Sequence, residues 1–274
     1  TQSTWVGKAG ISFVVKTTYT VFGSGDMEVK NTITVNGNNV PPLPKIGMQM
    51  QLPASFRNLS WYGRGPFESY WDRKSSARVG EYSGQVADQH FSYIMPQENG
   101  NKTDVRWAAI TDSVGVGLLV MGNPTLDFSA HDYTDADLLA SKTSQNLSRG
   151  LTTTLNLDYK LMGLGGDDSW TPRTHPEYLL TDKEYSYSFR LRPFDATTPL
   201  VSITQTSLPE ITAQSQAASE LGAPASIVKE VAPGGVAQTN EEQEAAIKKA
   251  EARKYIKKKP TYRKKSSAKK KKKR

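Results

Sequence analysis

Apolar and polar residues alternate along several stretches of the chain, and this alternation predicts β-strands. Residues 11–22 and 27–35 place apolar or β-favouring side chains at every second position. Between them, residues 23–26 read Gly-Ser-Gly-Asp, and such residues tolerate the positive φ of a tight turn. The two stretches are therefore predicted to form an antiparallel hairpin.

The same period of two returns later in the chain, at residues 153–161 and 185–191. In the first of these stretches, the leucine side chains are predicted to point inward, while Asn156, Asp158 and Lys160 point outward. Strands of antiparallel sheets commonly bury one face and leave the other in water. Each predicted strand is therefore expected to bury only its apolar face.

Helical periodicity is scarce before residue 200. One short stretch, residues 135–142, is predicted to form two helical turns with Thr134 as the N-cap. No repeat of fixed period is present, which argues against a propeller or solenoid. A chain of 274 residues is long enough for one large all-β domain, so the predicted class is all-β and antiparallel.

The composition changes abruptly after residue 194. Residues 195–240 are rich in Ser, Thr, Ala, Gln and Pro and contain no aromatic residue, so they offer too little apolar surface to offset the entropy of ordering. We predict a β-domain over residues 1–194, a flexible linker over 195–240, and a lysine-rich tail over 241–274 that is partly helical or disordered.

The formal net charge of +8 is concentrated in this tail. Residues 241–274 hold 16 lysines and arginines against 4 acidic residues, so the tail carries +12 and the remainder carries −4. A disordered polycation binds polyanions non-specifically by releasing counterions, although a merely solvated tail is the simpler interpretation. The charge therefore gives no reason to expect a nucleic-acid site on the β-domain.

Several chemistries lack their usual motifs. The three histidines, His90, His131 and His175, have no four-residue helical spacing for zinc, and cysteine is absent. No nucleophile elbow, phosphate-binding loop or dinucleotide fingerprint is present. No apolar run approaches the roughly 20 residues needed to span a bilayer. Hydride, phosphoryl and acyl transfer therefore lose support.

Residues 61–73 combine aromatic residues, glycines and charges in one short segment. This mixture is typical of sugar-binding sites, because an aromatic ring packs on the apolar face of a pyranose while charged groups form hydrogen bonds with its hydroxyls. The alternative is a turn with a Tyr/Trp cluster that fills one end of a sandwich, with Asp72 and Arg73 paired at the surface.

Residues 95–107 form a second unusual segment, in which Asn99-Gly100 is a turn signal before a strand. Glu98 and Arg106 have no such local explanation. They are predicted either to pair and support the turn or to contact a sugar directly.

Residues 162–172 form the third segment, with three glycines in four positions. Glycines there permit a tight reversal or a close backbone approach. Trp170 then follows Asp167, Asp168 and Ser169, and it is either a sugar platform or a core plug. The two adjacent carboxylates are poor evidence for a catalytic pair, since their side chains should diverge.

Four ordered segments carry a resemblance to a known family: residues 43–48, 61–73, 96–107 and 163–170. They closely resemble the C-terminal small-chain domain of bacterial β-galactosidases of glycoside hydrolase family two, over about residues 10–194. The resemblance implies a large antiparallel β-supersandwich, similar to the galactose-mutarotase fold, placed last in a multidomain and often tetrameric enzyme.

The resemblance also implies where the chemistry lies. In that family a (β/α)₈ barrel carries the acid/base and nucleophile glutamates, and Mg²⁺ assists. None of that barrel is in this sequence, so no catalytic residue is assigned here and the chain alone is expected to be inactive. The implied partners are a β-galactoside substrate, the catalytic barrel of the same enzyme, and further copies of that enzyme in a homo-oligomer.

The resemblance assigns substrate binding to four residues of the third segment: Gly166, Asp168, Ser169 and Trp170. It places Trp170 as the platform for the substrate, chiefly its aglycone side. By the same resemblance, three residues are expected to support the cleft: Glu98, Asn99 and Arg106. The alternatives are a stand-alone mutarotase with Glu98 and His90 as acid and base, or a non-catalytic carbohydrate-binding domain.

Overall fold

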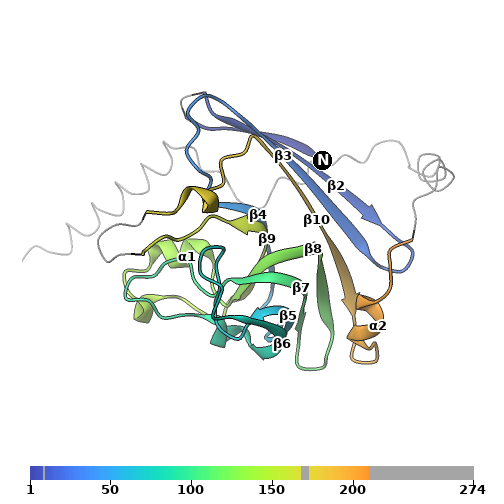
Figure 1. Ribbon diagram of the computed structural model, residues 1–274. Helices are drawn as coiled ribbons and strands as arrows, with labels where there is room; N and C mark the ends of the chain where they lie inside the picture. Colours follow the sequence, from blue (N-terminus) through green and yellow to red (C-terminus); the bar gives the residue numbers. More distant parts are fainter. Residues whose placement is uncertain (9, 168–172, 210–274) are drawn as a thin grey trace, which may run out of the picture. The chain divides into compact units, whose positions relative to one another are not determined.

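The computed structural model describes residues 1–8, 10–167 and 173–209 (Figure 1). The chain divides into two units, Thr1–Glu210 and Ile211–Arg274, and every described residue belongs to the first. The lysine-rich tail and most of the predicted linker lie outside the described residues.

Ten strands form the sheet, and every pairing between them is antiparallel. The strands run in the order β1-β2-β3-β10-β8-β7-β5-β6, while β9 pairs with both β8 and β4. Their bounds are β1 Gln2–Val6, β2 Ser12–Val21, β3 Met27–Asn36, β4 Lys45–Pro53, β5 Asn58–Gly65, β6 Arg78–Gln85, β7 Lys102–Thr111, β8 Gly117–His131, β9 Thr152–Leu161 and β10 Glu184–Phe194.

The predicted hairpin and helix are confirmed. β2 and β3 pair from Ser12↔Asn36 to Val21↔Met27, and Gly25 has a φ of 88° in the turn. The helix α1 spans Asp135–Ala140, and Thr134 and Asp137 cap its first turn through reciprocal hydrogen bonds. The antiparallel all-β class is confirmed as well.

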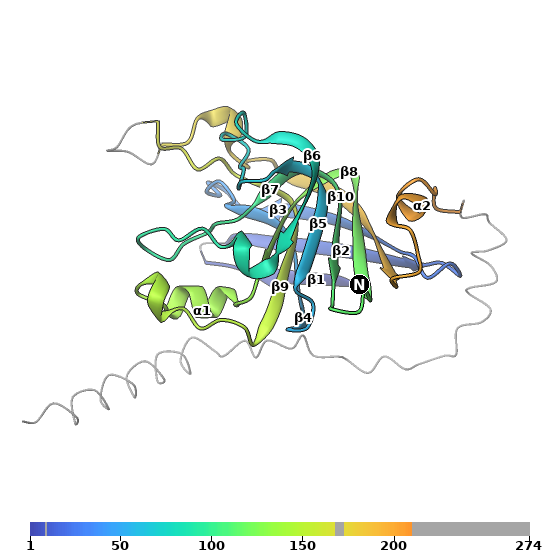
Figure 2. The ribbon, with the colours of Figure 1, turned by 90° about the horizontal axis from the view of Figure 1, so that it is seen from below.

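Side chains from strands at opposite ends of the sheet share one core, which requires the sheet to curve around them. Val29 of β3, Trp61 of β5 and Leu157 of β9 belong to the same buried cluster. Asn31 of β3 also reaches Met48 of β4, with Nδ2 3.3 Å from the sulfur. The arm of β4 and β9 therefore lies against the layer of β2, β3 and β10 (Figure 2).

The prediction that each strand buries one face is wrong for β9. Asn156 and Asp158, predicted to point outward, are 3% and 2% exposed. β9 is flanked by β8 and β4, and Asn156 bonds side chains on both, Ser129 Oγ at 2.9 Å and Gln49 Nε2 at 2.9 Å. Cross-strand partners thus satisfy the buried amide of Asn156 without water.

The packed structure continues past residue 194, where the composition predicts the start of a linker. Residues Leu200–Thr204 form the short helix α2, and its Ile203 is buried against Ala109 and Leu119. The two short helices lie at opposite ends of the sheet (Figures 1 and 2).

Candidate functional site

The glycine-rich segment forms a loop between β9 and the short 3₁₀ turn Pro176–Tyr178. Residues 163–167 and 173–175 of this loop are described, whereas Asp168, Ser169 and Trp170 lie outside the described residues. Gly165 and Gly166 have φ values of 66° and 88°, which residues with a Cβ rarely adopt. Gly166 is therefore placed in the loop as predicted, and its backbone requires glycine.

Hydrogen bonds and an ion pair join the two ends of this loop. The Gly163 amide donates to the Tyr178 carbonyl at 2.8 Å, and the Thr174 hydroxyl donates to the Gly163 carbonyl at 2.9 Å. Asp167 and His175 form an ion pair, and the hydrogen bond that His175 Nε2 donates to the Asp167 carboxylate raises the pKa of His175. We call these contacts the neck of the loop.

Asp72 holds the neck from outside. Its Oδ2 accepts a hydrogen bond from the Gly165 amide at 2.8 Å. A Cβ on Gly163 would lie 2.7 Å from the same oxygen and 2.7 Å from Tyr178 Cβ, so only glycine fits there. Trp71 packs edge-to-face on Tyr178, with the ring centroids 5.6 Å apart. The predicted pair of Asp72 with Arg73 is absent among the described contacts, because Asp72 faces the loop.

Glu68 joins the first unusual segment to the second. It accepts a hydrogen bond from the Gly100 amide at 2.8 Å, pairs with Arg73 at 2.6 Å, and bonds the Tyr93 hydroxyl. Ser69 also accepts from the Thr103 amide at 3.0 Å. Residues 68–72 therefore contact both other segments that sequence analysis singled out, although their sequence gave no sign of these contacts.

The aromatic side chains of the first segment divide between core and site. Trp61 and Tyr70 are 1% and 0% exposed, and Trp61 packs against Phe128 in the core. These two rings are thus buried, although they do not form one cluster in the described structure. Trp71 is the aromatic side chain of this segment that reaches the neck.

Glu98 and Arg106 do not pair with each other in the described structure. Glu98 lies 3.7 Å from Lys45 Nζ. Arg106 donates to the Asp104 carbonyl at 2.6 Å and lies over the Tyr62 ring.

Asn99 is buried, and its side chain serves local structure. Its Oδ1 accepts from the Phe91 amide at 2.9 Å, and its Nδ2 donates to the Tyr133 hydroxyl at 3.0 Å. The same hydroxyl lies 2.9 Å from His90 Nδ1. Asn99 therefore ties its segment to Phe91 and Tyr133, and a role for it in supporting the cleft stays a prediction.

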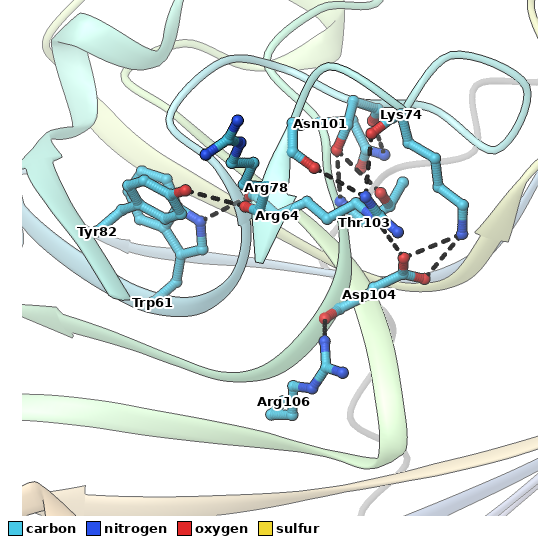
Figure 3. Close-up of polar contacts among 11 residues, drawn as sticks. Trp61, Arg64, Lys74, Arg78, Tyr82, Asn101, Thr103, Asp104 and Arg106 are labelled. Carbon is cyan, nitrogen blue, oxygen red and sulfur yellow. Dashed lines mark hydrogen bonds and ion pairs between the residues drawn. The ribbon is translucent and has the colours of Figure 1, made fainter. Parts of the chain in front are cut away.

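A second ionic network lies behind the first segment and was not expected from sequence (Figure 3). Asp104 sits where the register between β7 and β8 shifts, and its φ of 54° is unusual for a residue with a Cβ. Its carboxylate pairs with Arg64 Nε at 2.5 Å and with Lys74 Nζ at 3.0 Å. Burial acts to raise the pKa of Asp104, but these hydrogen bonds and charges outweigh it and lower the pKa.

Within residues 1–8, 10–167 and 173–209, no group of three or more His, Cys, Asp or Glu is placed to hold a metal ion. The Mg²⁺ implied by the family resemblance thus finds no fitting site in this part of the chain. None of the helices among these residues is long and apolar enough to cross a membrane.

Comparison with known proteins identifies the family. Residues 2–191 match the family described as β-galactosidase small chain. The chain is 42% identical over 177 residues to a β-galactosidase of Priestia megaterium, and 41% identical over 174 residues to one of Vibrio cholerae. Each alignment covers 64% of this chain but only 17% and 16% of those relatives, so the chain spans about a sixth of their length. The family match extends over most of the described sheet and includes the neck of the loop, and the chain therefore belongs to the β-galactosidase small-chain family.

Proposed function

We propose that this chain completes the substrate cleft of a retaining β-galactosidase, which hydrolyses terminal β-D-galactose from β-galactosides. The observation that carries the proposal is the neck of the glycine-rich loop. Gly163 and Gly165 on one side, and Thr174 and His175 on the other, are fixed by Asp72, Tyr178 and one another. Because these ends are already fixed, they do not have to be ordered when a ligand is bound.

In this proposal Trp170 supplies an aromatic face for the apolar C–H side of a pyranose. Asp168, Ser169 and the Gly166 backbone offer hydrogen-bond partners for sugar hydroxyls. The chain binds and orients the substrate in this way, and it also excludes water from one side of the cleft. No acid, base or nucleophile is assigned to it.

The chemistry belongs to partners outside this chain. Retaining hydrolysis needs two carboxyl groups about 5–5.5 Å apart, and we assign these to glutamates of a catalytic barrel in the same enzyme. Mg²⁺, when bound there, would supply electrostatic stabilisation. A homo-oligomeric assembly is part of the same proposal. The family and the relatives reported above give no support to a stand-alone mutarotase.

Trp170→Ala in the full enzyme should raise the Michaelis constant for lactose roughly 5- to 150-fold. This range corresponds to a lost stacking and burial contribution of about 1–3 kcal/mol. Trp170→Phe, which keeps an aromatic face, should recover part of the loss. Steady-state kinetics on lactose and on a chromogenic β-galactoside would measure both variants.

Two outcomes would contradict the proposed role. An unchanged Michaelis constant in Trp170→Ala would show that Trp170 is not a platform for the substrate. Hydrolysis of a chromogenic β-galactoside by the purified chain, with no other protein added, would show that the catalytic carboxyl groups are within it.

Asp72→Ala should raise the Michaelis constant about tenfold, because the Gly165 amide loses its acceptor and the neck loosens. Asp72→Asn keeps an acceptor oxygen and should stay close to the parent enzyme. If Asp72 acts only by positioning the loop, Asp72→Ala should add little in a Trp170→Ala background. Full additivity in this double-mutant cycle would count against a positioning role.

A further inference from the structure

A pocket opens where β8 exchanges one partner strand for another. β8 pairs with β10 as far as Asn123, and it pairs with β9 from Asp127 onward. Between these two points β10 and β9 diverge. The resulting pocket has a volume of about 300 Å³, which is at the lower end for small-ligand sites.

The walls of this pocket come from five parts of the chain and mix aromatic with charged groups. They include Trp71 at the end of the first segment and Lys74 just after it, Asp104 from β7, Asp127 from β8, Lys160 from β9 and Tyr187 from β10. The two lysines and Asp104 give the pocket charges of both signs. A pocket of this kind suits a neutral ligand that has many hydroxyl groups and one apolar face.

The charged groups are held in place by contacts with one another, with Trp71 and with Arg64. Arg64 and Lys74 fix the Asp104 carboxylate (Figure 3), and Lys160 Nζ lies 3.8 Å from the centroid of the Trp71 ring. Asp127 is only 8% exposed. Burial, followed by the charge of Asp104, raises the pKa of Asp127 to about 7. A buried carboxyl with this pKa gains from a ligand hydroxyl that can both donate and accept a hydrogen bond.

We propose that this pocket binds a monosaccharide, as one pyranose ring, at a site separate from the substrate cleft assigned to the loop. The sugar face packs on the Trp71 and Tyr187 wall, and its hydroxyls bond Asp127, Asp104 and Lys160. None of the described residues of the loop, 163–167 and 173–175, lines this pocket. Because Trp71 also packs on Tyr178, the occupied pocket lies directly behind the neck of the loop.

Titration of the purified full chain with D-galactose, followed by tryptophan fluorescence and by calorimetry, tests the proposal. Saturable binding with a dissociation constant of about millimolar is expected for so small a ligand. Asp127→Asn and Lys160→Met should each weaken binding about tenfold. Asp88→Asn, which changes an exposed acid on the 3₁₀ turn Val86–Gln89, serves as the matched control and should bind as the parent does.

A second comparison separates this site from the loop. Binding that persists in Trp170→Ala and weakens in Asp127→Asn and Lys160→Met assigns the sugar to the pocket. Binding that is lost in Trp170→Ala but unchanged in the two pocket variants would overturn the pocket proposal and leave the proposed function standing. Absence of saturable binding up to roughly a hundred times the expected dissociation constant would overturn it as well. If Asp127→Asn does not fold, the binding measured for Lys160→Met alone tests whether the sugar occupies the pocket.

Discussion

Replacing Asp26 with alanine should lower the free energy of unfolding by about 3–5 kcal/mol. Asp26 ends the β2–β3 turn, and its carboxylate bonds Arg190 Nε at 2.6 Å and Arg192 Nη1 at 2.8 Å on β10. The Asp26 and Arg190 side chains are 3% and 11% exposed. The variant would leave the largely buried guanidinium of Arg190 without its counter-charge. Removing one partner of a buried ion pair is strongly destabilising, because the remaining charge is uncompensated. Denaturant unfolding of the chain measures the loss.

Asp112→Ala is the matched control for this prediction. Asp112 also closes a hairpin turn, where its Oδ1 accepts from the Val114 and Val116 amides, but it pairs with no arginine in the described structure. Asp112→Ala should lower the free energy of unfolding by only on the order of 1 kcal/mol. Equal losses for the two variants would show that the arginine pairs contribute little beyond the turn.

The Asp26 effect should also depend on pH. Burial acts to raise the pKa of Asp26, but the hydrogen bonds from Arg190 and Ser24 and the charges of both arginines outweigh burial and lower the pKa. A lowered carboxyl pKa contributes stability above the unfolded value of about 3.9, and that contribution is lost as the pH falls through the folded value. The difference between parent and Asp26→Ala should therefore be complete at pH 7 and shrink below about pH 4.

Asp127→Asn should increase the free energy of unfolding at pH 8 by up to about 4 kcal/mol and have little effect at pH 4. The pKa of Asp127 is raised to about 7, mainly by burial and then by the charge of Asp104. A raised carboxyl pKa means that the folded state holds the proton more tightly than the unfolded state does. The parent protein therefore loses stability as the pH rises from about 4 through 7, and the amide removes that loss.

Unfolding curves between pH 4 and pH 8 measure this prediction, with the exposed Asp88→Asn as a control. The control should follow the parent protein throughout. An Asp127→Asn variant that stays less stable than the parent at pH 8 would mean that the carboxylate is well compensated in the folded state.

The strands and turns followed from local patterns in the sequence. The hairpin of β2 and β3 could be predicted because residues 23–26 tolerate the turn and the flanking side chains alternate. The capped helix after Thr134 could be predicted for a similar reason, since its cap lies within four residues. Both features depend on neighbours along the chain.

The burial of β9 could not be predicted in this way. Its polar residues Asn156 and Asp158 are indistinguishable in sequence from residues on a solvated face. Asn156 is met by side chains of two other strands, Gln49 of β4 and Ser129 of β8, and Gln49 lies 107 residues earlier in the chain. Gly47 of β4 leaves the space for the Asp158 carboxylate, since a Cβ there would lie 1.8 Å from Asp158 Oδ1.

The candidate site shows the same division. Local patterns were enough to predict the class of fold, the three unusual segments and the resemblance that links them to β-galactosidases. Packing of distant segments was needed to show that Asp72 bonds Gly165, that Glu68 bonds Gly100, and that β8 opens a pocket between β10 and β9. Alternation and turn signals act over a few residues, whereas these contacts join groups that are 32 and 93 positions apart and become neighbours only when the sheet curves.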